Sequence, residues 1–177
     1  MVDPVFRGLY HGRSVHDCDI ASVLGRAADV GVASVILTSG TVHEYRENER
    51  IIEEFRATSR VSLYTTVGVH PTRCSEVEAI GVEAYFSSLQ ALLDSPSEPL
   101  VALGECGLDY ARLEHSPRDL QLKWFESHFT RLTTDLPMFL HLREALPDFL
   151  SILARHRSVF EARGGLVHSF TERVAEP

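Results

Sequence analysis

The sequence predicts an α/β fold built on a parallel β-sheet, and two observations lead to that prediction. Five short apolar runs recur along the 177-residue chain, and they begin roughly 27 to 38 residues apart. Between these runs, apolar residues repeat with the spacing of one helix face. Because parallel strands need a long crossover, usually a helix, this alternation predicts repeated βα units. The length suits one domain, so we expect a single domain over residues 1–177.

The five predicted strands share an apolar centre and end near glycine or polar residues. The first reads ASVILTSG, and the third reads EPLVALGECG, in which an apolar run leads directly into a glutamate. The predicted strands cover residues 33–40, 60–71, 98–107, 136–143 and 164–170.

The helices between the strands are predicted from apolar spacing and from end signals. In the first, apolar residues fall at i, i+3, i+4, i+7 and i+8 counted from Ile20, and Gly31 ends it. In the segment SPRD, Ser116 is the expected N-cap and Pro117 the first helical position. The predicted helices begin near Ile20, Val42, Val82, Ser116 and Ala145.

Two parallel architectures fit this alternation, an open doubly wound sheet and a (β/α)8 barrel. No GxGxxG motif follows the first strand, which disfavours a dinucleotide-binding doubly wound domain. A full barrel needs about 250 residues, and this chain is shorter by two or three βα units.

The composition limits the classes of function. Hydrophobic residues make up 44% of the chain and charged residues 24%, which is ordinary for a globular domain. The net charge is −8, from 17 basic and 25 acidic residues. Because basic side chains drive binding to polyanions, the chain does not read as a general nucleic-acid binder. If its substrate is nucleic acid, a bound cation must supply positive charge.

The sequence shows neither a recognisable targeting signal nor a cysteine spacing typical of disulfides or CxxC sites. No apolar run approaches the 18 residues of a membrane helix, and the first residues lack the apolar part of a signal peptide. The three cysteines, Cys18, Cys74 and Cys106, have no CxxC spacing, which favours a reducing compartment. We therefore expect a nuclear or cytoplasmic location, or both, and no membrane association. No stable protein partner is predictable from the sequence.

A histidine or a glutamate stands at the end of four consecutive strands. They are His70 in GVHP, Glu105 in GECG, His141 in FLHLR and His168 in GLVHSF, and Arg143 follows His141. In parallel α/β folds, the carboxyl ends of the strands share one face, and that face carries the site. Imidazoles and carboxylates are ligands for divalent cations, so the pattern predicts a metal site.

Each of these residues also has a plain structural reading. Taken alone, His168 is typical of a hydrogen-bonded core histidine, His70 of a turn residue, and Arg143 of a partner for a helix-borne acid. Their position at equivalent strand ends favours the metal site over these readings. Cys106, beside Glu105, is expected to be a small buried residue.

Four ordered motifs resemble those of the TatD metal-dependent deoxyribonucleases, which belong to the amidohydrolase-like barrel superfamily. They are VGVHPTRC, VALGECGLDY, LPMFLHLR and GLVHSFT, and the stretch DPVFRGLYHGRSVHDCDI resembles the eukaryotic branch. The resemblance implies a TIM-type (β/α)8 barrel. Family members also carry a polar pair on a first strand and a metal-binding Asp on a late strand. Neither is found here, so we expect an incomplete barrel of about five of the eight βα units, truncated at both ends.

The resemblance also implies roles for the residues at the strand ends. Glu105 would be the carboxylate ligand, shared when two metals are bound, and His141 and His168 would be imidazole ligands. His70 and Arg143 would contact the scissile phosphate or the attacking water, so Glu105, His70 and Arg143 are the expected catalytic residues. The implied cofactors are one or two divalent cations, Mg, Mn or Zn. The implied reaction is hydrolysis of DNA by metal-activated water, in the manner of a 3′–5′ exonuclease.

Two other functions remain open at this point. The superfamily barrel supports many chemistries, so a metal hydrolase acting on a different ester or on an amide is one alternative. The other is a catalytically impaired, truncated paralogue.

Overall fold

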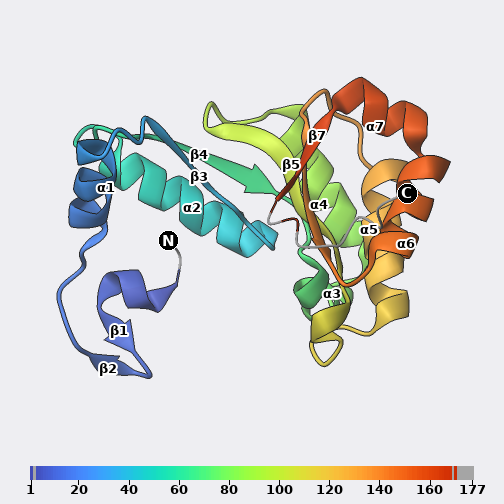
Figure 1. Ribbon diagram of the computed structural model, residues 1–177, viewed down its shortest axis with the longest axis horizontal. Helices are drawn as coiled ribbons and strands as arrows, with labels where there is room; N and C mark the ends of the chain where they lie inside the picture. The colour runs from blue at the N-terminus through green and yellow to red at the C-terminus, as the bar shows by residue number, and fades with distance from the viewer. Residues whose placement is uncertain (2, 169, 171–177) are drawn as a thin grey trace, which may run out of the picture.

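The computed structural model describes residues 1, 3–168 and 170 of the chain. A five-stranded parallel sheet runs through its centre (Figure 1). The strands lie where the sequence predicts them, so the α/β fold with a parallel sheet is confirmed. They are β3 (Ser34–Leu37), β4 (Ser62–Val67), β5 (Leu100–Asp109), β6 (Met138–Arg143) and β7 (Gly165–His168).

The order of the strands in the sheet decides between the two architectures. The strands lie side by side in chain order, β3-β4-β5-β6-β7. A doubly wound sheet reverses its order at a switch point, whereas a (β/α) barrel pairs each strand with the next one. The order is therefore that of a barrel. The described residues supply five strands of the eight in a closed TIM-type barrel, so the fold is an incomplete one.

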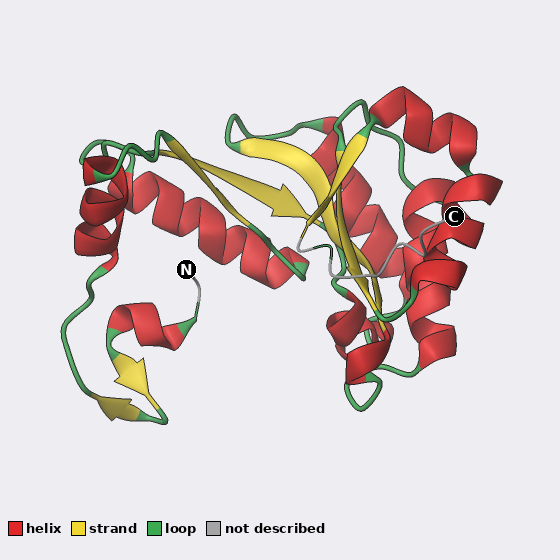
Figure 2. Cartoon of the chain, viewed as in Figure 1, coloured by secondary structure: helices red, strands yellow, loops and turns green. Residues whose placement is uncertain are grey.

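A helix follows each of the first four strands of the sheet, as the crossover connections require (Figure 2). In α2, the Thr41 hydroxyl accepts the backbone N–H of Glu44 at 3.1 Å and caps the first turn. No helix in the described part of the chain is long and apolar enough to cross a bilayer. The five predicted helices are confirmed as α1 (Ile20–Asp29), α2 (Val42–Phe55), α4 (Val82–Asp94), α5 (Arg118–Thr130) and α6 (Leu146–Arg155).

Several short elements are present that the sequence analysis does not predict. A hairpin of two-residue strands lies before α1, away from the main sheet (Figure 1). Elements this short contain too few residues to show a periodic pattern. They are η1 (Pro4–Arg7), β1 (Leu9–Tyr10), β2 (Arg13–Ser14), η2 (Pro71–Arg73), α3 (Cys74–Glu78), η3 (Tyr110–Arg112) and α7 (Arg157–Arg163).

The prediction of Ser116 as the N-cap of the fourth predicted helix, α5 in the structure, is wrong. Pro117 occupies the N-cap position, and α5 begins at Arg118. The hydroxyl of Ser116 instead accepts the backbone N–H of Ser75, at 3.0 Å. A tertiary contact with α3 has therefore taken the hydroxyl that a local cap would use.

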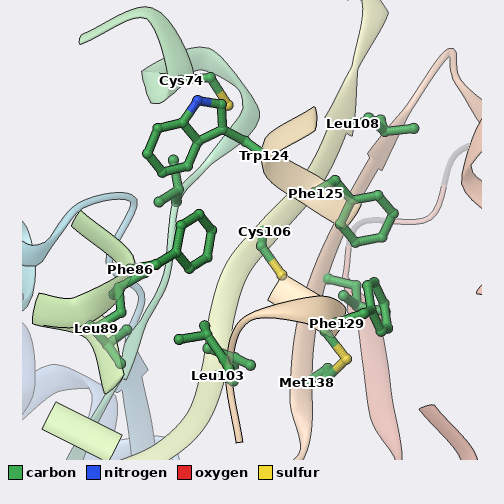
Figure 3. Close-up of a cluster of buried hydrophobic side chains, with 14 of the residues drawn as sticks. Cys74, Phe86, Leu89, Leu103, Cys106, Leu108, Trp124, Phe125, Phe129 and Met138 are labelled. Atoms are coloured by element: carbon green, nitrogen blue, oxygen red, sulfur yellow. The ribbon is translucent and has the colours of Figure 1, made fainter. Parts of the chain in front are cut away.

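The main core lies between the sheet and the helices α4, α5 and α6, and a smaller one joins α1 to α2. Figure 3 shows Cys106 of β5 among the aromatic side chains of α4 and α5, including Phe86 and Phe125. The thiol is fully buried, and this burial raises its pKa. Because successive side chains of a strand face opposite sides, Cys106 on the core side leaves Glu105 on the other side of the sheet.

A buried histidine fastens the main core to the loop after β4. The backbone N–H of Val69 donates to Nε2 of His128 at 3.2 Å, and the opposite ring nitrogen lies 2.8 Å from the carbonyl of Trp124. Since Nε2 accepts, the ring is neutral with its proton on Nδ1. Burial is the main cause that lowers the pKa of His128 from 6.5 to about 4.

This burial predicts that the protein loses stability in mild acid. Between pH 6.5 and about 4 the unfolded chain binds a proton at His128 that the folded chain does not. The free energy of unfolding should therefore fall by about 3 kcal/mol as the pH is lowered through that window. Urea titrations at several pH values measure it. His128→Gln should flatten the pH dependence, and identical slopes for the two proteins would contradict the prediction.

Candidate metal centre

Side chains from three strands, β5, β6 and β7, and from the segment after β4 meet at a single carboxylate oxygen. Oε1 of Glu105 lies 2.8 Å from Nδ1 of His141 and 2.5 Å from Nε2 of His168. Nε2 of His70 lies 3.5 Å from the same oxygen. Glu105 is in β5, His141 in β6 and His168 at the end of β7, while His70 follows β4. The prediction that these four residues converge on one face of the sheet is therefore confirmed by the geometry.

The four side chains form two overlapping sets of three. The ligand atoms of His70, Glu105 and His141 all lie within 4.8 Å of one another, as a shared cation requires. Nε2 of His168 is also 3.2 Å from Nδ1 of His141. Glu105 and His141 belong to both sets, so they form the centre of the cluster.

Arg143 stands apart from this cluster. It is the last residue of β6, two positions beyond His141, and its side chain is exposed on the same face of the strand. Among the described residues it makes no hydrogen bond or ion pair with the four clustered side chains. Its role in contacting substrate stays a prediction.

Two glycines let β5 and β6 approach closely enough to form the cluster. Gly104 and Gly107 have φ values of +142° and +150°, which side-chain-bearing residues rarely adopt. A Cβ at Gly104 would lie 2.1 Å from the Phe139 carbonyl oxygen, and one at Gly107 would lie 1.9 Å from the His141 carbonyl oxygen. The backbone at the ligand-bearing positions of β6 therefore sits where only a glycine can face it.

The backbone of Glu105 is also tied to the segment after β3. Its N–H donates to the carbonyl of Ser39 at 3.1 Å. Ser39 is held in turn by the buried side chain of Asn48 in α2, which donates to the Ser39 hydroxyl at 2.9 Å and to the Leu37 carbonyl at 3.0 Å. The sequence analysis does not identify this buried network, because a lone Asn in an amphipathic helix carries no signal for it.

The environment of Glu105 favours its charged form. Burial by itself would raise the pKa of this carboxyl, which is 9% exposed. Hydrogen bonds with His141 and His70, and the electrostatic effect of the neighbouring His70 and His168, outweigh burial and hold its pKa far below the ordinary value. The site therefore contains an anionic oxygen surrounded by imidazole nitrogens.

The ring of His70 is oriented by the turn that it starts. Nδ1 of His70 accepts the backbone N–H of Thr72 at 3.2 Å, so His70 caps η2. A neutral ring that accepts at Nδ1 carries its proton on Nε2. That N–H is directed toward Glu105 and His141. His70 is thus arranged as a hydrogen-bond donor toward the cluster.

The donor set fits a divalent cation. Glu105, His141 and His168 offer one oxygen and two nitrogens, the ligand types that Zn²⁺ and Mn²⁺ accept in proteins. A pocket of about 220 Å³ adjoins Glu105 and is lined also by Thr38, His70, Thr72 and Arg73. Its lining also includes Glu44, whose carboxylate pairs with Arg73 at 2.8 Å, so the pocket places an ion pair and two hydroxyl groups next to the cluster.

One buried acid beside the cluster escapes the sequence analysis. Asp109 ends β5 and is 1% exposed, and its Oδ2 lies 3.3 Å from Nε2 of His141. A usable signal exists in the sequence, because Glu105 and Asp109 are four residues apart on a strand and so lie on one face.

Comparisons with known proteins agree with this geometry. Residues 11–177 match the family model described as TatD related DNase. A fission yeast protein from Schizosaccharomyces pombe, "Deoxyribonuclease Tat-D", is 38% identical over 98% of this chain and 55% of its own length. A Rahnella protein, "3'-5' ssDNA/RNA exonuclease TatD", is 33% identical over 89% of this chain and 56% of its own length.

The structure of a hydrolase TatD family protein from Entamoeba histolytica superimposes with a TM-score of 0.83 at 33% identity. The match covers 96% of this chain and 56% of that one. This chain therefore spans about half the length of the curated relatives that it matches.

Because β5 and β6 approach closely at Gly107, we expect one added methyl group there to lower the stability of the protein. We expect Gly107→Ala to lower the free energy of unfolding by about 1–3 kcal/mol, because the added Cβ meets the His141 carbonyl. Urea unfolding followed by circular dichroism measures the change. Gly25→Ala in α1, where nothing lies within 4 Å of the added Cβ, is the matched control and should be neutral or stabilising. Equal stabilities for Gly107→Ala and the parent chain would contradict the prediction.

Proposed function

This chain belongs to the TatD related DNase family, and from that membership we propose that it is a divalent-metal-dependent deoxyribonuclease that hydrolyses phosphodiester bonds. The observation that supports the proposal best is the meeting of three imidazoles with the Glu105 carboxylate on one face of the sheet. The relatives are named as a deoxyribonuclease and as a ssDNA/RNA exonuclease, so DNA is the substrate class that both names share.

Glu105, His141 and His168 would hold the cation. When bound there, a divalent cation lowers the pKa of a coordinated water and withdraws charge from a phosphoryl oxygen. It also supplies the positive charge that a chain of net charge −8 lacks for binding a polyanion.

The remaining residues of the site would bind and orient the substrate. His70 presents its Nε2–H toward the cluster and is placed to donate to a phosphate oxygen. The exposed guanidinium of Arg143 extends from the same face and suits a phosphate, because its N–H groups match two oxygens at once. His70 and Arg143 would thus hold the phosphodiester in place while Glu105 and the imidazole ligands hold the cation.

We further propose a 3′–5′ exonuclease mode on single-stranded substrate. This finer assignment is supported by the names of bacterial relatives such as the Rahnella protein. A nuclear or cytoplasmic location is consistent with a DNA substrate and with three unpaired cysteines, and it stays a prediction.

The proposed function predicts metal-dependent digestion of DNA that requires Glu105. With Mg²⁺ or Mn²⁺ present, a 5′-labelled single-stranded oligonucleotide should give a ladder of progressively shorter labelled products on a denaturing gel. EDTA should abolish it. Glu105→Gln should reduce the rate by about 100-fold or more, since it removes the anionic ligand that would hold the cation at the developing charge.

His115→Ala changes an exposed histidine outside the cluster and serves as the matched control, with full activity expected. Digestion that survives both EDTA and Glu105→Gln would refute the proposal. Metal-dependent cleavage of a small carboxylic ester without any cleavage of DNA would assign the site to another hydrolase reaction.

A further inference from the structure

Asp109 is a buried acid whose side chain has no established task. Both of its carboxylate oxygens are inaccessible to solvent, and neither has a hydrogen-bond partner among the described residues. Nε2 of His141 is likewise inaccessible to solvent and has no hydrogen-bond partner among the described residues. Unpartnered buried polar groups are rare and costly, so two of them facing each other require an explanation.

The backbone of Asp109 is held firmly from both sides. Its N–H donates to Oε1 of Gln121 at 2.8 Å, and its carbonyl accepts Nε2–H of Gln121 at 2.9 Å. Gln121 is fully buried in α5 and also donates to the carbonyl of Ser116 at 2.8 Å. The carboxylate is therefore presented from a fixed point of the fold.

The fixed carboxylate lies behind the ring of His141. Oδ2 of Asp109 is 3.3 Å from Nε2 of His141, whereas Nδ1 of the same ring faces Glu105 and His168. The ring thus lies between the cluster on one side and Asp109 on the other. The 3.3 Å between Nε2 and Oδ2 is close to the length of an N–H···O hydrogen bond, although the two atoms do not form one in this structure.

No other described group accounts for the burial of this acid. The nearest guanidinium nitrogen, Nε of Arg112, is 3.9 Å from Oδ2, and its side chain is 52% exposed. Ion pairs to such exposed arginines contribute little to stability. The acid is also not capping a helix, because its side chain makes no cap hydrogen bond to η3.

We propose that Asp109 is a positioning residue for the metal ligand His141: its carboxylate receives Nε2–H and so leaves Nδ1 free to bind the cation. A carboxylate behind a histidine ligand fixes which nitrogen carries the proton, fixes the ring angle and raises the electron density of the binding nitrogen. The inference rests on the proposed metal-dependent function. It adds a residue to that site, and Gln121 becomes the support that places it.

The role predicts opposite effects of mutation on metal binding and on stability. Loss of a residue that orients a metal ligand typically weakens metal binding 10- to 100-fold. The metal-free protein, however, should be as stable or more stable, because a buried carboxylate without a partner is removed. If Asp109 merely supported the fold, its mutation would lower both the metal affinity and the stability of the metal-free protein.

The experiment titrates ZnCl₂ into the metal-free full chain by isothermal calorimetry and records the melting temperature in EDTA. Asp109→Asn, which keeps one acceptor oxygen but removes the charge, should weaken zinc binding about 10-fold, and Asp109→Leu about 100-fold. Both should melt at or above the temperature of the parent chain. Asp119→Asn removes the same charge from an exposed position of α5 and should leave zinc affinity unchanged.

Each result decides the matter. Unchanged zinc affinity in both Asp109 variants would overturn the inference and leave the proposed function standing. Weaker binding together with a lower melting temperature in EDTA would assign Asp109 a structural role and also overturn it. A parent chain that binds no zinc would overturn the inference, and the DNA digestion assay with Mg²⁺ or Mn²⁺ would decide the proposed function separately. If Asp109→Leu does not fold, Asp109→Asn decides alone.

Discussion

The candidate site depends on the distance between the backbones of β5 and β6. Glu105 and His141 are brought to 2.8 Å because Gly104 and Gly107 allow the two strands to approach where a side chain would collide with backbone oxygens. The electrostatic effect of the imidazoles depends on this steric constraint, since they can lower the pKa of Glu105 only when they lie beside it. The cluster is therefore a consequence of how the sheet packs.

Buried polar residues hold the ends of the strands in place around that contact. Asn48 of α2 binds the segment after β3, and His128 of α5 binds the backbone of Val69, next to His70. Gln121 of α5 binds the backbone N–H and carbonyl of Asp109 at the end of β5. In each case a side chain from a helix satisfies backbone groups that the sheet leaves free at its carboxyl edge. The helices thus position the site as well as covering the core.

The cluster at the carboxyl edge of the sheet would reconcile the negative net charge of the chain with a polyanionic substrate. An acidic chain repels a polyanion, and the basic side chains near the cluster are few. A cation held by Glu105, His141 and His168 would place positive charge where the phosphate must lie, and Arg143 extends from the same face. The rest of the surface can then remain acidic, because only the local field at the site has to attract the substrate.

The sequence by itself determined the alternation of strands and helices, the four residues that form the cluster and, through its motifs, the family. These features depend on local periodicity and on the order of residues along the chain, which a single sequence displays. The strand order that selects a barrel over a doubly wound sheet depends on pairing between distant segments. The tertiary structure also decided that Ser116 contacts Ser75 instead of capping α5, that His70 presents Nε2–H, and that Asp109 lies behind His141. A side chain takes whichever partner the folded chain brings within reach, and that choice is made by packing between elements that no local pattern records.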